Sequence, residues 1–116
     1  MRIILDHSVP TKLRSFLVGH TVETAYQRGW AALKNGALLK AIEAEGFEVF
    51  VTADQKMRYQ QNLTGLPFAM VVLGTNLWPV IADHPGKIVE VMKTVSAGTV
   101  AIVHYPKPVL VRRPAP

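Results

Sequence analysis

Two short apolar runs that each end on an aspartate constrain this chain more than any other feature. Ile3–Leu5 leads into Asp6, and Val49–Ala53 leads into Asp54. Both runs are rich in β-branched residues and are followed by a helical pattern, which is typical of buried strands in a parallel sheet. In open α/β sheets, ligands bind at the edge formed by the carboxyl ends of the strands. If the two strands are neighbours, we expect both carboxylates to converge on that edge.

A pair of carboxylates at one sheet edge is suited to Mg²⁺ or Mn²⁺, because these ions prefer oxygen ligands. A simpler interpretation is that each aspartate caps the turn or helix that follows it. Both interpretations remain open for Asp6 and Asp54, and the function of the chain depends on which one is correct.

Length and composition favour a single domain. The chain has 116 residues, 49% of them hydrophobic, which is enough to bury one core. The absence of cysteine excludes disulfides and thiolate metal sites and fits a reducing compartment. Asp6 interrupts the first apolar run too early for a signal peptide, and the run at 68–74 is too short to span a bilayer. We therefore expect a cytoplasmic protein without a membrane segment.

The positive charge of the chain is concentrated near its C-terminal end. The net charge is +5, and residues 106–116 contain four prolines and three basic side chains but no acid. We therefore expect a domain at residues 1–105 followed by an extended tail at 106–116 that lies outside the core. A mild positive balance permits nucleic-acid binding, although solubility alone would also explain it.

Hydrophobic periodicity predicts that strands and helices alternate along the domain. Strands are expected at residues 3–5, 21–24, 47–52, 68–73 and 99–103. Helices are expected from Ser8 and Pro10 to Gly19, at residues 35–45 with Asn35 as the cap, and from about residue 83 to Gly98. One helical turn is expected within 55–65, and a loop is expected at Trp78 and Pro79. This order predicts an α/β fold with a mostly parallel sheet and helices on both faces. The order of the strands within the sheet cannot be read from the sequence.

Polar, basic and aromatic residues are expected to surround the two aspartates. The Thr52 hydroxyl should point to the same side as the Asp54 carboxylate two residues later. Side chains suited to RNA are expected around these positions: Lys34, Lys56 and Arg58 flank them, and Arg28 is expected close by, all suited to phosphates. Trp30 and Tyr59 offer flat faces on which a base could stack. The simpler interpretation is that the basic residues are solvated charges and that Trp30 packs against the sheet. The amide-rich run at 60–62 is interpreted as a hydrogen-bonded loop, with substrate contact as the alternative.

Other common catalytic and binding motifs do not occur in the sequence. No glycine-rich loop matches a phosphate-binding or dinucleotide-binding pattern. The four histidines lack the spacing of a zinc site. His7 and Ser8 are adjacent, but they lack the surrounding sequence of a nucleophile elbow.

Five short motifs together resemble a known family. They are Leu-Asp-His-Ser-Val-Pro at 5–10, Gly-Trp at 29–30, Lys-Asn-Gly-Ala-Leu-Leu at 34–39, Val-Thr-Ala-Asp-Gln at 51–55 and Tyr-Gln-Gln-Asn-Leu at 59–63. With these motifs, residues 1–103 resemble the PIN-like family of small bacterial proteins, which is related to toxin ribonucleases. The resemblance implies a three-layer α/β/α PIN-like fold and a divalent-metal site built from acidic side chains. Such proteins are often encoded as toxins beside a small helical antitoxin.

The chain departs from the family pattern at positions that normally carry acids. His7 and Ser8 stand where the family usually has Glu followed by Asn or Cys, and Ala37 stands where it usually has Glu. Only Asp6 and Asp54 remain, which suffices for one Mg²⁺ with waters but supports a two-metal mechanism poorly. His7 could serve Mn²⁺, although a surface position is the simpler interpretation.

The resemblance therefore implies a Mg²⁺- or Mn²⁺-dependent endoribonuclease of weakened activity. Its catalytic residues would be Asp6, Asp54, Thr52 and Asn35, with the metal held weakly by the two aspartates and RNA contacted by Lys34, Lys56, Arg58 and Tyr59. Two alternatives remain: a catalytically degenerate PIN-like domain that binds RNA or a protein partner, and a structural or regulatory protein. The partners considered are RNA, a small helical antitoxin and a second copy of the chain.

Overall fold

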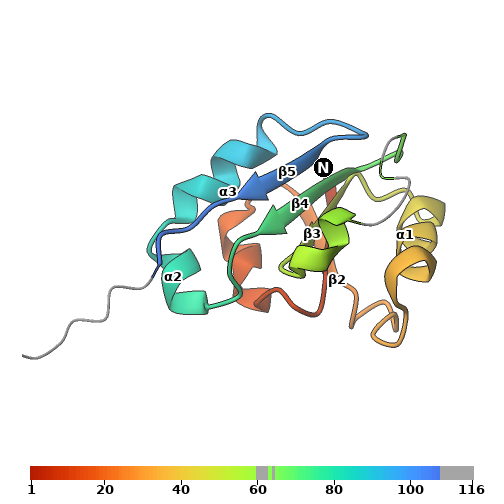
Figure 1. Ribbon diagram of the computed structural model, residues 1–116, viewed down its shortest axis with the longest axis horizontal. Helices are drawn as coiled ribbons and strands as arrows, with labels where there is room; N and C mark the ends of the chain where they lie inside the picture. The colour runs from red at the N-terminus through yellow and green to blue at the C-terminus, as the bar shows by residue number, and fades with distance from the viewer. Residues whose placement is uncertain (60–62, 64, 108–116) are drawn as a thin grey trace, which may run out of the picture.

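The computed structural model describes residues 1–59, 63 and 65–107 (Figure 1). In chain order, with η for a 3₁₀ helix, the elements are β1 (Arg2–Leu5), η1 (Thr11–Phe16), β2 (Thr21–Thr24), α1 (Asn35–Ala44), β3 (Val49–Thr52), η2 (Gln55–Tyr59), β4 (Ala69–Leu73), α2 (Trp78–Ala82), α3 (Pro85–Met92) and β5 (Val100–Val103). The run at 60–62 and residues 108–116 of the expected tail lie outside the described residues.

Five parallel strands form one sheet in the order β2-β1-β3-β4-β5. The chain places β2 on one side of β1 and then returns to add β3, β4 and β5 on the other side. This reversal between β1 and β3 is the place where open α/β sheets bind ligands, outside the carboxyl ends of the strands. The predicted α/β fold is confirmed, and the sheet is wholly rather than mostly parallel. The three-layer PIN-like arrangement stays a prediction.

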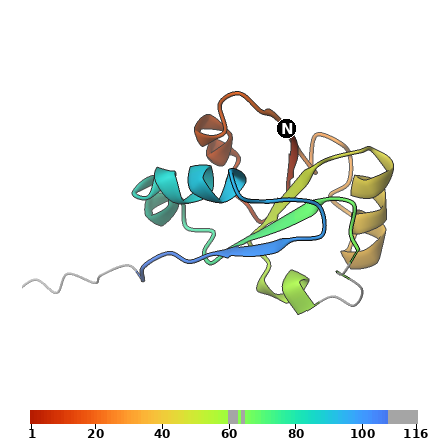
Figure 2. The same cartoon turned by 90° about the horizontal axis from the view of Figure 1, so that it is seen from above.

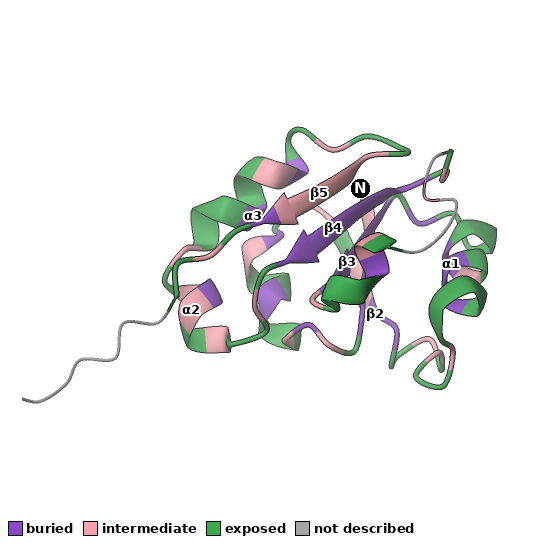
Figure 3. Ribbon diagram, viewed as in Figure 1, coloured by how far each residue is buried: buried purple, intermediate pink, exposed green. Residues whose placement is uncertain are grey.

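Alternating side chains of the strands belong to two separate hydrophobic clusters, as the period of two in a strand requires. The members of the first cluster include Ile3, Val49 and Val71 with Leu13, Ile81, Ile88 and Met92. The members of the second include Ile4, Phe50 and Met70 with Leu38, Ile42 and Met57. The first cluster therefore joins η1, α2 and α3 to the sheet, and the second joins α1 and η2 to it (Figure 2). The central strands β3 and β4 are buried throughout, while β2 and β5 are partly exposed (Figure 3).

The helix at α1 forms as its sequence predicts. Leu38 and Ile42 are one turn apart and are both buried in the second cluster. Gly46 has a φ of +73°, a conformation that glycine adopts without the steric penalty of a Cβ atom. The chain can therefore leave α1 and turn directly into β3.

The last third of the chain differs from the sequence-based prediction. The expected loop at Trp78 contains α2, which tolerates Pro79 because the proline lies in the first turn of the helix. The Trp78 ring stacks on Phe16 of η1, with ring centroids 5.4 Å apart. The helix expected to reach Gly98 ends at Met92, and the Thr94 hydroxyl donates a hydrogen bond to the Val91 carbonyl just beyond it. Short local side-chain bonds of this kind compete with helix continuation.

The connection from β4 to β5 has the opposite hand to the other connections. β3, β4 and β5 follow each other in one direction across the sheet, but η2 packs in the second cluster whereas α2 and α3 pack in the first. Connections on opposite faces that advance in the same direction must have opposite hands. By the same reasoning, the connections through η1 and α1 share the hand of the one through η2. Parallel strands are almost always joined by right-handed connections, so the last connection is the exception.

In the described part of the chain, none of the helices is long and apolar enough to cross a membrane.

Candidate functional site

A pocket at the carboxyl ends of β1 and β3 contains half of the eight residues that the sequence predicts to act together, namely Asp6, Lys34, Asn35 and Asp54. Its volume is about 220 Å³. The lining residues are Asp6, His7, Leu33, Lys34, Asn35, Leu38, Asp54 and Met57. The pocket lies at the reversal of strand order, so the strand-end rule correctly placed Asp6 and Asp54 at one site.

The Asp6 carboxylate is buried and strongly engaged by its neighbours. Its side chain is 4% exposed. The Oδ2 atom accepts hydrogen bonds from the Ser8 hydroxyl at 2.9 Å and from the Thr52 hydroxyl at 2.8 Å. The Oδ1 atom accepts one from the His7 backbone N–H at 2.9 Å, and the Nδ1 atom of the His7 ring lies 3.0 Å from it. A carboxylate has about four acceptor positions, so Asp6 is close to fully satisfied within the protein.

Two hydroxyl groups connect Asp6 to the end of β3. The Thr52 side chain is fully buried, and its hydroxyl accepts a hydrogen bond from the Asp54 backbone N–H at 3.1 Å while it donates to Asp6. The Ser8 hydroxyl likewise accepts from the Ala53 backbone N–H at 3.0 Å. Each hydroxyl therefore uses its single proton on the carboxylate and its lone pairs on the backbone. The network fixes the two strand ends relative to each other.

Asp54 is exposed and has a different role from Asp6. Its Oδ1 atom accepts a hydrogen bond from the Lys56 backbone N–H at 2.9 Å, and its carbonyl accepts one from Met57 at 3.1 Å. These bonds are those of a residue that caps the start of η2. The capping interpretation is therefore correct for Asp54, which also lines the pocket.

Asn35 and Lys34 line the same pocket at the start of α1. The expectation that Asn35 caps this helix is wrong, because Lys34 occupies the cap position and no side-chain cap bond is formed. Asn35 instead adopts a φ of +45°, which asparagine tolerates better than most residues. Its exposed side chain belongs to the pocket. Ala37 is exposed in the first turn of α1 and does not line the pocket.

The other predicted RNA-contacting residues lie on η2, outside the pocket lining. Lys56 is exposed. The Arg58 guanidinium lies over the Tyr59 ring, 4.7 Å from its centroid, and donates a hydrogen bond to the Tyr59 hydroxyl. Tyr59 itself is 72% exposed, so a flat aromatic face and a cation are presented together beside the pocket.

Arg28 and Trp30 make contacts within the fold and do not line the pocket. Arg28 forms ion pairs with Glu23 at 3.1 Å and with Glu45 at 3.3 Å. The hydrogen bond with Glu23 is the main cause that raises the pKa of Arg28 above its usual value. The Trp30 ring packs edge-on against Phe47 at a centroid distance of 6.1 Å. The two residues hold the loop after β2 against α1 and the sheet.

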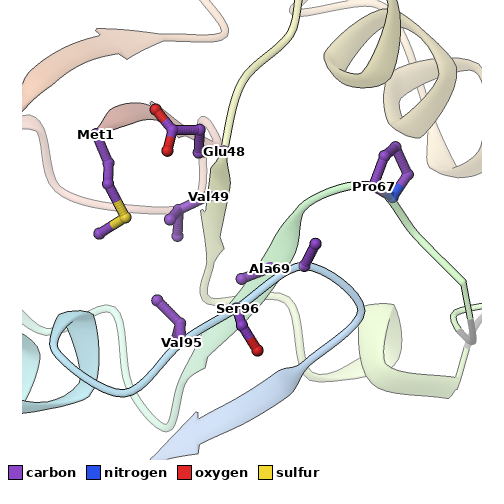
Figure 4. Close-up of a pocket in the computed structure, with 8 residues that line it drawn as sticks. Met1, Glu48, Val49, Pro67, Ala69, Val95 and Ser96 are labelled. Atoms are coloured by element: carbon purple, nitrogen blue, oxygen red, sulfur yellow. The ribbon is translucent and has the colours of Figure 1, made fainter.

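A second hollow of similar size, about 250 Å³, lies at the opposite edge of the sheet, and Figure 4 shows it. Its lining is mainly apolar and includes Met1, Val49, Ala69 and Val95. The one carboxylate there, on Glu48, already accepts a hydrogen bond from the Arg2 backbone N–H at 3.0 Å. Of these two pockets, the one at Asp6 and Asp54 is therefore the one with more polar groups suited to chemistry.

The donor set of the first pocket suits one hard cation held loosely. Among the described residues, no group of three or more His, Asp or Glu side chains is arranged to hold a metal. Asp54 can offer carboxylate oxygens directly, while Asp6 can offer Oδ1 only if the exposed His7 ring moves aside. One or two carboxylates with waters are a common set for Mg²⁺, so the residues present fit a weak single-ion site.

Sequence reasoning missed the part that Ser8 takes in this site. The signal was present, since a serine two residues after an aspartate at a strand end can bond back to that aspartate.

Comparison with family models, with curated proteins and with solved structures finds no match for this chain.

Proposed function

We propose that this protein is a metal-dependent endoribonuclease of the PIN-like class with weakened activity, and that it acts as the toxin component beside a small helical antitoxin. The observation that carries the proposal is the meeting of Asp6 and Asp54 in one pocket at the reversal of strand order. Carboxylates at this edge are suited to Mg²⁺ or Mn²⁺. When bound, such an ion would activate water and stabilise charge on the phosphate.

The residues around the pocket would bind the metal, position its ligands and orient water or phosphate. Asp54 would be the main ligand, because its carboxylate is exposed and only one backbone bond occupies it. Thr52 would position both aspartates, because its hydroxyl donates a hydrogen bond to the Asp6 carboxylate and accepts one from the Asp54 backbone N–H. Asn35, on the pocket wall, would orient water or a phosphate oxygen through its amide.

RNA would approach over the basic and aromatic residues beside the pocket. Lys34 lies in the pocket wall, where an ammonium group would contact the phosphate that is cleaved. Lys56 and Arg58 would contact neighbouring phosphates, and Tyr59 offers a stacking face to an unpaired base. The preferred substrate would therefore be single-stranded.

We expect weak activity because the pocket has only two acidic side chains, Asp6 and Asp54, among its lining residues. Two carboxylates attract a dication less than the larger acidic set of the family pattern would. One of the two, Asp6, is already satisfied by Ser8, Thr52 and His7. The site therefore has to release an existing contact before both aspartates can act.

The test is cleavage of a fluorescent single-stranded RNA with Mg²⁺, Mn²⁺ or EDTA. We expect slow cleavage that requires metal and that Asp54→Asn abolishes. The matched control is Asp83→Asn, which changes an exposed aspartate at the end of α2 and should cleave like the wild type. Cleavage that survives Asp54→Asn, or that persists in EDTA, would show that the pocket is not a metal-dependent active site.

The satisfied state of Asp6 favours a second candidate, a PIN-like domain that binds RNA or a protein partner without cutting. This candidate predicts that RNA binds equally well with and without metal. Lys34→Ala should weaken that binding in fluorescence anisotropy, and Asp54→Asn should not. Loss of RNA binding on adding EDTA would rule it out in favour of the nuclease.

A further inference from the structure

We propose that the His7 side chain occupies the place on Asp6 where a divalent cation would bind, and that it thereby limits the affinity of the site for metal. His7 then competes with the metal for Asp6 and is not a metal ligand. This inference rests on the proposed function, because it concerns the same pocket.

The contacts around Asp6 differ in how easily they can be given up. The Thr52 hydroxyl is fully buried, and Ser8 is held in turn by the Ala53 backbone N–H. The third donor is the His7 backbone N–H, which is fixed by the chain itself. The His7 ring, in contrast, is 64% exposed and lies 3.0 Å from Oδ1 through its Nδ1 atom. It is the one contact that can leave without disturbing a strand end.

The ring also lies on the side that a metal would have to use. Both His7 and Asp6 line the pocket, together with Asp54. The Oδ2 atom is occupied by the hydroxyls of Ser8 and Thr52, so Oδ1 is the atom of Asp6 that would be left to hold a cation. The ring nitrogen and the cation compete for that atom, and binding of one requires departure of the other.

Lys34 does not provide the same block. It lines the pocket, but among the ion pairs of the described residues none joins its ammonium group to either aspartate. Replacing His7 should therefore free Asp6 without a second cation taking its place at once.

The experiment measures Mn²⁺ affinity by isothermal titration calorimetry for the wild type, His7→Ala, His7→Ala with Asp6→Asn, and Asp54→Asn. We expect His7→Ala to bind Mn²⁺ about fivefold more tightly, a factor at the upper end of what a partly exposed side-chain contact contributes. Adding Asp6→Asn should remove the gain. The matched control is His104→Ala, an exposed histidine at the end of β5, which should bind like the wild type.

A second measurement, by NMR, follows the His7 ring directly and does not rest on comparing affinities between variants. Titration with Mg²⁺, which is diamagnetic, should shift the NMR signals of the His7 ring as it leaves Asp6, and those of His104 should stay in place. Direct ligation by His7 would also shift the ring, but His7→Ala would then weaken Mn²⁺ binding, which overturns the inference.

The remaining outcomes separate the inference from the proposed function. If the wild type binds Mn²⁺ in a manner that Asp54→Asn abolishes, and His7→Ala stays within twofold of it, the His7 inference is wrong and the metal site stands. If neither the wild type nor His7→Ala binds Mn²⁺ at millimolar concentration, both the inference and the metal-dependent function are wrong.

Discussion

Replacing Thr52 by valine tests whether the hydroxyl network at the sheet edge stabilises the fold. Valine has nearly the same shape as threonine, so the change removes a hydroxyl and leaves the packing of β3 in place. The lost group donates to Asp6 at 2.8 Å and accepts from the Asp54 backbone N–H at 3.1 Å. Since Thr52 is fully buried, water cannot replace it at the carboxylate.

The expected loss follows from the charge of the acceptor. A hydrogen bond to a charged group contributes about 1.5–3 kcal/mol to stability. The freed Asp54 N–H adds little, because Asp54 is exposed and water can bond to it. We therefore expect Thr52→Val to lower the free energy of unfolding by about 1.5–3 kcal/mol, or Tm by about 6–12 °C for a domain of this size.

Equilibrium urea unfolding followed by circular dichroism measures the effect. Thr52→Ser keeps the hydroxyl and deletes one methyl group, so it should lose only about 1 kcal/mol. Thr94→Val removes an exposed hydroxyl beyond α3 and should stay within about 0.5 kcal/mol of the wild type. If Thr52→Val is as stable as the wild type, or if Thr52→Ser loses as much as Thr52→Val, the hydroxyl is not what stabilises this edge.

Three further predictions concern other parts of the chain. Burial raises the pKa of Tyr105 above its usual value of 10.0, so the folded protein should lose stability as the pH rises through that raised pKa. Tyr105→Phe should remove this alkaline loss in urea titrations at successive pH values, whereas an unchanged pH profile would exclude Tyr105 as its source. Ala37 itself does not line the pocket, but it lies two residues after Asn35, which does, and a glutamate there has a longer side chain. Ala37→Glu should therefore tighten Mn²⁺ binding in calorimetry and raise RNA cleavage, because it adds a carboxylate in the first turn of α1, where the helix dipole favours it. Adding Asp54→Asn should cancel both gains, and no gain at all would place position 37 outside the site. Truncation after Tyr105 should leave Tm nearly unchanged; a fall of many degrees would show that the tail belongs to the core.

The strands could be predicted from the sequence because each is a short, β-branched run bounded by turn residues. Residues 21–24 were predicted with the bounds of β2, and the run at 68–73 contains β4. Strand order could not be predicted, since it depends on which hydrophobic faces meet after the helices have formed. Helix α2 was not predicted because the segment at Trp78 was interpreted as a loop, although the following Pro79 is compatible with the first helical turn.

The residues of the site could be predicted, but their bonding could not. The rule that strand ends share an edge placed Asp6 and Asp54 in one pocket. Whether an aspartate faces solvent or is enclosed by donors depends on side-chain rotamers and on the pairing of β1 with β3. The sequence therefore left metal binding and capping as equal alternatives, and the structure shows capping at Asp54 and near-complete hydrogen bonding at Asp6. The RNA-binding roles of Lys56, Arg58 and Tyr59 stay predictions.

The unusual hand of the last connection has a consequence for how the chain folds. It brings α2 and α3 to the same face as η1, where Trp78 stacks on Phe16. The apolar side of η1, which precedes α2 and α3 in the chain, is therefore fully covered only when those helices have formed. β1 likewise obtains its second neighbour only when β3 arrives. Neither half of the domain can complete its own core, so native-state hydrogen exchange should report β1, β3 and β4 opening as one cooperative unit rather than in two stages.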